Sequence, residues 1–460
     1  MLTTRPLTEL TEALRAGDIS ATELMRETLD QIDRLNPTLN AIVSLRDRGA
    51  LLAEAENPRP GLLSGIPMAI KDLTETAGLR TTHGSATMAD HVPMHDDRLA
   101  RRLKDAGAII IGKTNTPEFG VGSQTFNDVF GRTLNPYDQR RTCGGSSGGA
   151  SVAVASGMLP VADGSDMMGS LRNPAAWANI YGLRPTVGLI PRDMATSTDL
   201  PLSTDGAMAR HPGDLALMLE VLGGHQDGWP FDVKLSQPKL ALNGARIGWI
   251  GDAYGLPFED GLIELCKDAL DQMQDAGAGV SFVDQLPFDR DLAWTSWTTL
   301  RAALISSQNI EAYSDPSKRS RMKATVIWEI EKGLALSKDQ IGKAKNDRQA
   351  VLKSIETALE TFDVLALPTT QVWPFPVDEE YPMHIAGQDM DTYHRWMEAM
   401  IAASLPGLPA MSLPAGFGKN GLPAGISLIG RPGSDLDLIA IAEDWDRLTS
   451  WPSRRPPVVA

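Results

Sequence analysis

A run of small residues between Thr142 and Ser151 is the first place where this chain could do chemistry. It contains four glycines and two adjacent serines, Ser146 and Ser147, and reads Thr-Cys-Gly-Gly-Ser-Ser-Gly-Gly-Ala-Ser. Glycines allow backbone conformations that side chains normally forbid. Successive amide groups in such a loop can converge on an anion. The loop therefore predicts a site for a negatively charged group or transition state.

Three other segments could supply reacting groups. They are residues 65–72 (Gly-Ile-Pro-Met-Ala-Ile-Lys-Asp), 112–115 (Gly-Lys-Thr-Asn) and 166–172 (Asp-Met-Met-Gly-Ser-Leu-Arg). We take Ser170 as the candidate nucleophile, because it lies where a strand is expected to give way to a helix that Asn173-Pro174 opens. A serine hydroxyl needs a base to remove its proton. None of the seven histidines has an obvious link to this motif, so a histidine base is not expected.

In this order and spacing, the four segments resemble the amidase signature family of serine hydrolases, over nearly the whole chain as far as residues 425–433. The resemblance implies that Lys71 is the general base, and that Ser146 passes the proton from Ser170 to Lys71 and then to the leaving nitrogen. The family holds this serine after a cis peptide bond, here Gly145–Ser146. A lysine base must be neutral, which requires burial that lowers its pKa well below about 10.4. For an isolated Lys-Asp pair, the alternative is an exposed lysine at the end of a strand.

The resemblance also implies an oxyanion hole made of the backbone N–H groups of Met167, Met168, Gly169 and Ser170. The family pattern is Asp-x-Gly-Gly-Ser, and here Met168 replaces the first glycine. The backbone donors survive this change, but the added side chain narrows one wall of the site. We therefore expect catalysis to be retained and the preference for the acyl group to change.

Further residues are assigned supporting roles by the same resemblance. Asp166 and Arg172 should hold the nucleophile turn rigid, for which a surface salt bridge is the alternative, and Ser147 is a third supporting residue. Apolar and aromatic residues near the motifs are candidates for the substrate pocket: Phe119, Val121, Phe126, Met168 and Trp177.

Other motifs are weaker. Residues 145–149 also fit Gly-x-Ser-x-Gly, the nucleophile elbow of α/β-hydrolases, but residues 140–143 are not the apolar strand that this motif requires. Cys143 has no histidine partner in the sequence and is interpreted as a packed residue. His91 and His95 have the spacing of a helical metal pair. Because Pro93 between them breaks any helix, no metal site is expected there.

Elements that would position these residues alternate between strands and helices, which indicates an α/β fold. A mixed β-sheet core between layers of helices is expected, as one domain over residues 1–460, with a signature core at about 62–205 and a helical lid at about 285–350. A capping box at residues 20–23 starts a helix that Asn36-Pro37 should end. The other expected strands are 66–71, 108–111, 159–162, 246–250, 280–283, 363–367 and 421–430, and the other helices are 97–106, 149–156, 258–276 and 435–448.

Composition limits the possible partners. A net charge of −15 argues against a nucleic acid. Two cysteines cannot form a disulfide framework, so a reduced protein is expected. The sequence shows no signal peptide and no apolar run of about 20 residues. We therefore expect a cytoplasmic protein without a membrane span. The protein is expected to be a monomer or a homodimer.

Taken together, the sequence predicts an amidase that cleaves the C–N bond of a carboxamide or a carbamate through an acyl-enzyme on Ser170. The substrate should be small and carry an apolar or aryl group, esters and urethanes remain open, and no metal or organic cofactor is implied. Two alternatives remain. One is the amidotransferase A subunit, which uses the same triad in a complex that binds transfer RNA. The other is an inactive binding module on the same fold.

Overall fold

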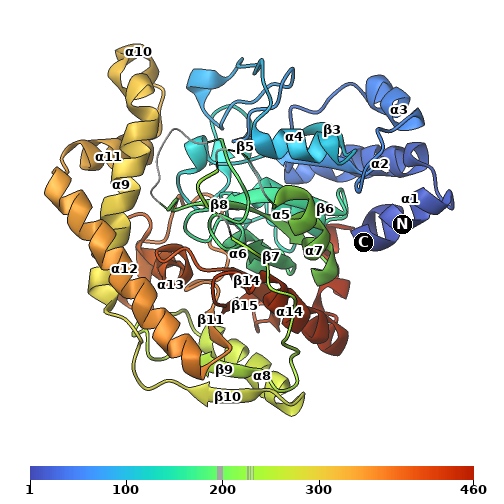
Figure 1. The fold of residues 1–460 in the computed structure, drawn as a ribbon. Coiled ribbons are helices and arrows are strands. Elements are labelled where there is room, and N and C mark those ends of the chain that lie inside the picture. Colours follow the sequence, from blue (N-terminus) through green and yellow to red (C-terminus); the bar gives the residue numbers. More distant parts are fainter. Residues whose placement is uncertain (194–199, 225–226, 228, 232, 460) are drawn as a thin grey trace.

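A mixed β-sheet forms the centre of the molecule (Figure 1). The computed structural model describes residues 1–459 except 194–199, 225–226, 228 and 232. Among these residues, parallel pairing joins the first three strands of the sheet, and every later pair is antiparallel. The strand order is β10 (Gly279–Phe282), β9 (Arg246–Trp249), β11 (Val364–Pro368), β15 (Pro423–Ile429), β14 (Ala410–Phe417), β7 (Tyr181–Arg184), β8 (Thr204–Ala209) and β6 (Val161–Asp166).

Helices cover both faces of this sheet, as the sequence predicts. Alternate residues of a strand point to opposite faces, and β11 shows the result. Val364 and Ala366 belong to a core shared with α8 (Leu262–Asp275) and α14 (Asp435–Thr449). Leu365 and Leu367 belong to a second core, shared with α6 (Arg172–Trp177) and with the helical region described below. The result is one α/β domain with a buried sheet.

A smaller sheet carries the candidate base. Its order is β1 (Ile42–Val43), β3 (Ile109–Thr114) and β2 (Pro67–Lys71), with β2 parallel to β3. The sheet packs with helix α5 (Gly148–Ala155) and with α2 (Ala21–Leu39), in a third core that includes Ile109, Ile111 and Ala69. The backbone N–H of Lys71 lies 3.3 Å from both carboxylate oxygens of Asp163 on β6, which joins this sheet to the central one.

The remaining helices and short strands surround these sheets. They are α1 (Leu7–Ala16), α3 (Arg48–Glu56), α4 (Arg98–Asp105), α7 (Pro212–Leu222), α13 (Ile401–Ser404), β4 (Phe126–Asn127), β5 (Gly131–Arg132), β12 (His384–Ile385) and β13 (Gln388–Asp389). None of the helices in the described ranges has the length and apolar character that crossing a membrane requires.

A helical region stands at one side of the central sheet, in yellow and orange in Figure 1. It contains α9 (Arg290–Ser314), α10 (Pro316–Arg319), α11 (Ala324–Leu334) and α12 (Lys338–Thr361). This agrees with the helical segment predicted for residues 285–350, although the last helix continues to Thr361. Trp294 and Trp297 of α9 are buried in the core on this side of the sheet, so the tryptophans of this helix serve packing.

Some predicted boundaries are wrong. The helix expected from residue 258 begins at Leu262, and the strand expected at 159–162 lies at Val161–Asp166. The end of the first long helix is also wrong. Helix α2 continues through Pro37 to Leu39 instead of ending at Asn36-Pro37. Proline removes a single backbone donor from the last turn. The Asn36 side chain accepts hydrogen bonds from the backbone N–H groups of Ala41 and Ile42, both at 2.8 Å, and Leu39 is fully buried. These contacts stabilise the turn that the proline would otherwise weaken.

Candidate active site

Lys71 lies at the end of β2 with its amino group among three serine hydroxyls. Its Nζ is 2.7 Å from Ser146 Oγ, 2.8 Å from Ser147 Oγ and 3.1 Å from Ser165 Oγ. The side chain is buried, with 1% of the residue exposed. Burial lowers the pKa of Lys71 from 10.5 to about 7, although Asp163 and other nearby carboxylates act in the opposite direction. An exposed lysine at a strand end is therefore excluded, and a neutral amine is accessible near neutral pH.

The glycine-rich loop brings Ser146 and Ser147 to this lysine. The Gly145–Ser146 peptide bond is cis, in agreement with the family resemblance. A Cβ atom on Gly149 would lie 2.3 Å from the backbone nitrogen of Asn115, so only glycine permits this approach of the loop to β3. The N–H of Ser147 donates to the carbonyl oxygen of Ser170 at 3.1 Å, which joins the loop to the nucleophile turn.

Ser170 lies in the turn between β6, which ends at Asp166, and α6, which begins at Arg172. This is the strand-to-helix turn that the sequence predicts. Gly169 has φ = +87°, and a Cβ atom there would lie 2.7 Å from Met400 Cγ. Ser170 is 8% exposed and lines the same cavity as Ser146. Within the described part of the chain, its Oγ makes no hydrogen bond, so the transfer of a proton from Ser170 to Ser146 is part of the proposal below.

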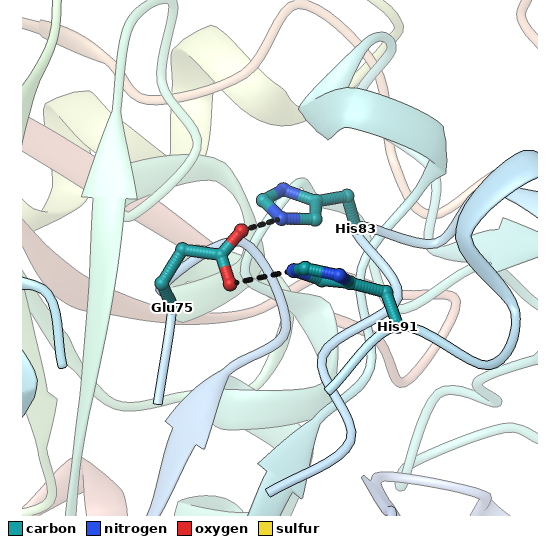
Figure 2. Close-up of side chains that lie close together, drawn as sticks. All are labelled: Glu75, His83 and His91. Carbon is teal, nitrogen blue, oxygen red and sulfur yellow. Dashed lines mark hydrogen bonds and ion pairs between the residues drawn. The ribbon is translucent and has the colours of Figure 1, made fainter. Parts of the chain in front are cut away.

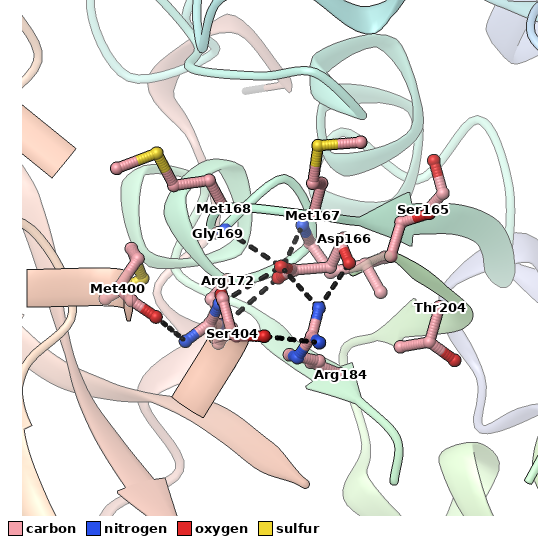
Figure 3. Close-up of polar contacts among 12 residues, drawn as sticks. Ser165, Asp166, Met167, Met168, Gly169, Arg172, Arg184, Thr204, Met400 and Ser404 are labelled. Atoms are coloured by element: carbon pink, nitrogen blue, oxygen red, sulfur yellow. Dashed lines mark hydrogen bonds and ion pairs between the residues drawn. The ribbon is translucent and has the colours of Figure 1, made fainter. Parts of the chain in front are cut away.

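Asp166 holds this turn through a buried network (Figure 3). Its carboxylate accepts hydrogen bonds from Arg172 at 2.9 and 3.0 Å, from the Gly169 N–H at 2.8 Å and from Arg184 at 3.3 Å. Burial alone would raise the pKa of Asp166, but the two guanidinium groups lower it well below its usual range. All three side chains are at most 1% exposed, which excludes the surface salt bridge considered above.

Replacing Asp166 with alanine should lower the free energy of unfolding by about 3–5 kcal/mol, because two buried guanidinium groups would lose their counter-ion. Asp105→Ala is the matched control, because Asp105 pairs with Arg59 at 3.0 Å at the exposed surface and its loss should cost less than about 1 kcal/mol. Urea unfolding of both variants measures the difference. Equal losses would mean that the buried network contributes no more than a surface pair.

The backbone amides of the turn are the candidate oxyanion donors, with one change from the prediction. The Gly169 N–H already donates to Asp166, so it is not free for a substrate oxygen. The amides of Met167, Met168 and Ser170 remain. The residues Met167, Met168 and Ser170 also line the cavity.

This cavity has a volume of about 410 Å³. Its apolar lining residues are Leu73, Met88, Phe119, Met167, Met168, Ile305 and Met397, and its charged or polar ones include Glu75, His83, Arg192, Ser203, Arg301, Gln308 and Asn309. Of the predicted pocket residues, Phe119 and Met168 lie here. Val121 and Phe126 line a separate, smaller pocket.

Trp177 does not contact this cavity in the described part of the structure, so the interpretation of this residue as a pocket wall is replaced. It is fully buried, stacked on Trp396 with ring centroids 5.6 Å apart and packed edge-on against Phe375. Its Nε1 lies 3.3 Å from Thr370 Oγ1. Helix α6 directs the Trp177 side chain into the buried core and not toward the cavity.

The two methionines of the turn are tied to α9. Trp297 Nε1 donates to Met168 Sδ at 3.2 Å, and Arg301 Nη1 donates to Met167 Sδ at 3.2 Å. Trp297 and Arg301 are four residues apart and share one face of the helix. Arg301 is held in turn by Glu329 at 2.7 Å and by the Tyr393 hydroxyl at 2.8 Å. Helix α9 is thereby fixed to the backbone that carries the candidate oxyanion donors.

Two residues of β6 belong to the site but are not indicated by the sequence. Asp163 accepts from the backbone of Lys71, and burial raises its pKa to about 7. Ser165 Oγ is the third hydroxyl around Lys71 Nζ. Both precede Asp166 at alternate positions of a strand. The alternation places them on one face of β6. They contact Lys71 because β2 lies beside β6, and no local pattern indicates that the two strands are neighbours.

Comparison with known proteins decides the family. The family model for amidases matches residues 23–439. The chain belongs to the amidase signature family. A curated relative of this amidase signature protein, the A subunit of glutamyl-tRNA(Gln) amidotransferase from Chloroflexus aurantiacus, is 32% identical over 97% of each chain. A relative with the same name from Picosynechococcus is also 32% identical, over 97% of this chain and 98% of the relative.

Solved structures give the same fold with different activities. A bacterial aryl acylamidase of the amidase signature family superimposes with a TM-score of 0.89 at 28% identity, covering 98% of this chain and 99% of the other. The A subunit of glutamyl-tRNA(Gln) amidotransferase from Thermotoga maritima gives a TM-score of 0.77, also at 28% identity, covering 97% and 95%. The α/β fold predicted from the sequence is confirmed by these neighbours.

Proposed function

We propose that this amidase signature protein hydrolyses the C–N bond of a carboxamide or a carbamate through an acyl-enzyme on Ser170. The observation that carries the proposal is the buried Lys71, whose pKa is lowered to about 7 and whose Nζ lies 2.7 Å from Ser146 Oγ in the cavity that also holds Ser170. A lysine that is neutral near pH 7 can accept a proton, which an exposed lysine cannot do.

The reaction then proceeds in two halves. Neutral Lys71 accepts the proton of Ser146 Oγ as Ser146 accepts that of Ser170 Oγ, and the Ser170 oxygen attacks the carbonyl carbon. The amides of Met167, Met168 and Ser170 stabilise the oxyanion. The proton returns through Ser146 to the leaving nitrogen, the C–N bond breaks, and an amine or ammonia departs. Water then attacks the acyl-enzyme by the same route, which regenerates Ser170 and releases the acid.

We propose further that the substrate carries an apolar or aryl group. Phe119, Met168 and Ile305 supply apolar surface to the cavity, and the aryl acylamidase has the higher TM-score of the two neighbours above. We propose that the helical region at 290–361 acts as a lid, because Ile305 and Asn309 of α9 line the cavity.

The second candidate function is that of an amidotransferase A subunit, and the curated relatives named above favour it. The same triad would then release ammonia from glutamine for use within a complex. One set of assays separates the candidates. Aryl amides, aliphatic amides, carbamates, aryl esters and glutamine are offered to the purified protein alone, and glutamine is offered again with the other subunits of a glutamyl-tRNA(Gln) amidotransferase. Turnover of aryl amides by the protein alone supports an amidase. Glutamine hydrolysis that appears only with partner subunits supports an amidotransferase.

Met168→Gly tests the proposed specificity. Methionine fills the space beside the oxyanion donors with a flexible apolar chain, so its removal should change kcat/KM unequally across acyl groups, by about tenfold or more (~1.4 kcal/mol of differential transition-state binding). Apolar and aromatic acyl groups should lose most. The alternative is that Met168 only packs against Trp297, in which case all substrates lose activity together and Tm falls. A uniform loss across the panel would contradict the specificity role.

A further inference from the structure

Glu75, His83 and His91 meet in one cluster (Figure 2), and Glu75 and His83 also line the cavity described above. The carboxylate of Glu75 lies between the two imidazoles, with Oε1 2.8 Å from His83 Nε2 and Oε2 3.0 Å from His91 Nε2. All three residues come from the segment between β2 and α4, at intervals of eight residues. His91 therefore finds partners earlier in the chain, and the His91–His95 pair considered in the sequence plays no part in the cluster.

The backbone of this segment holds the three side chains in place. The N–H of Glu75 donates to Asp97 Oδ2 at 2.8 Å, the carbonyl oxygen of His91 accepts from the Thr81 N–H at 3.0 Å, and that of His83 accepts from the Phe119 N–H at 2.8 Å. The side chains of Glu75, His83 and His91 are 30%, 19% and 36% exposed. They are thus positioned by the fold and still reachable from solvent.

We propose that these three residues bind one divalent transition metal of the Zn²⁺ class. Two imidazole nitrogens and one carboxylate are ligands that zinc takes in proteins, and three protein ligands leave a fourth position for water. The ligand atoms lie within 4.8 Å of one another. Tetrahedral coordination at bonds of about 2.0–2.2 Å places ligand atoms roughly 3.3–3.6 Å apart, so small side-chain rotations suffice. Each ligating imidazole then keeps its single proton on Nδ1.

The site would have a structural consequence for the cavity. Glu75 and His83 line the cavity that contains Ser146 and Ser170, and His91 contacts Glu75 from the same segment. A bound ion would therefore cross-link the segment that forms this wall. The imidazole ligands favour zinc, nickel, cobalt and copper ions over magnesium and calcium, which prefer oxygen ligands.

The test uses the full-length protein without a histidine tag, freed of metal by dialysis against a chelator. Zn²⁺ is titrated at neutral pH in competition with a chromophoric chelator. One equivalent should bind, and Glu75→Gln, His83→Gln and His91→Gln should each weaken binding by at least about tenfold. His95→Gln and His384→Gln are the controls. His95 is exposed and four residues from His91, and His384 forms an exposed pair with Asp389 at 2.5 Å, so neither change should alter the affinity.

Two further measurements on the wild-type protein keep the test decisive if a variant fails to fold. Zn²⁺ should raise Tm, whereas Mg²⁺ at the same concentration should not. Co²⁺ in place of Zn²⁺ should give the strong visible absorption of a four-coordinate site with nitrogen ligands. The proposal would be overturned if less than one equivalent of Zn²⁺ bound, or if the two control variants lost as much Zn²⁺ affinity as the three ligand variants. The weak spectrum of hydrated Co²⁺ would overturn it as well.

Discussion

Ser170→Ala should abolish turnover of every substrate in the panel while the fold remains intact. The loss of kcat should be about four orders of magnitude or more, because no acyl-enzyme can form without the Ser170 oxygen. Alanine removes one oxygen, which makes no hydrogen bond within the described structure, and adds no atom to the turn. The free energy of unfolding should therefore stay within about 0.5 kcal/mol of the wild-type value. Steady-state kinetics and urea unfolding measure the two quantities.

A fluorophosphonate probe identifies the nucleophile directly. It should label Ser170 in the wild-type protein, as read by peptide mass spectrometry, and should not label Ser170→Ala. Ser151→Ala is the matched control, because Ser151 is a buried serine on α5 whose Oγ donates to the Gly148 carbonyl outside the cavity. This variant should keep both labelling and turnover. A label on Ser147 or Cys143 would contradict the assignment of Ser170.

Lys71→Ala should lower kcat/KM by several orders of magnitude near pH 7, because the proton of Ser170 would have no acceptor behind Ser146. Some activity should return at high pH, where hydroxide replaces the base. Lys113→Met is the matched control. Lys113 is also buried, and burial lowers its pKa to about 8, but its Nζ donates to Thr76 Oγ1 and not to Ser146 or Ser147.

The pH profile of the wild-type protein shows whether activity rises as Lys71 loses its proton. The base acts when deprotonated, and burial lowers the pKa of Lys71 to about 7. Activity should therefore be low at pH 5, rise through about pH 7 and level off above it. Lys113→Met should keep this acidic limb in place. A limb set by a group near pH 6.5, together with a fully active Lys71→Ala, would indicate a histidine base and contradict the relay.

Local sequence patterns predict much of this fold, because burial of a strand or a helix leaves a regular pattern of apolar residues along the chain. The alternation of Ile66, Met68 and Ile70 predicts a strand that ends at Lys71, as β2 does. The glycine and serine between Asp166 and Arg172 predict the turn that joins β6 to α6. Continuous apolar runs such as residues 364–367 indicate the central strands. The triad itself depends on the family resemblance, since spacing in the chain does not show that Lys71 meets Ser146.

Contacts between distant segments account for what the sequence does not show. Asp163 and Ser165 reach Lys71 because β6 of the central sheet lies beside β2 of the smaller sheet, and no local signal specifies this contact between the two sheets. The pocket role predicted for Trp177 fails because a helix as short as α6 has too few turns to reveal which face is buried. The meeting of His83 and His91 depends on irregular backbone, for which periodicity gives no prediction.

The link between α9 and the nucleophile turn bears on any attempt to redesign this protein for larger substrates. Trp297 and Arg301 are bonded to the two methionines whose amides are the candidate oxyanion donors. Moving α9 outward to widen the entrance would pull on both sulfur atoms and so on the backbone between β6 and α6. If these amides bind the oxyanion as proposed, a change in substrate size that moves α9 should also change transition-state stabilisation. Engineering should enlarge the cavity by trimming side chains such as Ile305 or Met88, leaving the helix axis where it is.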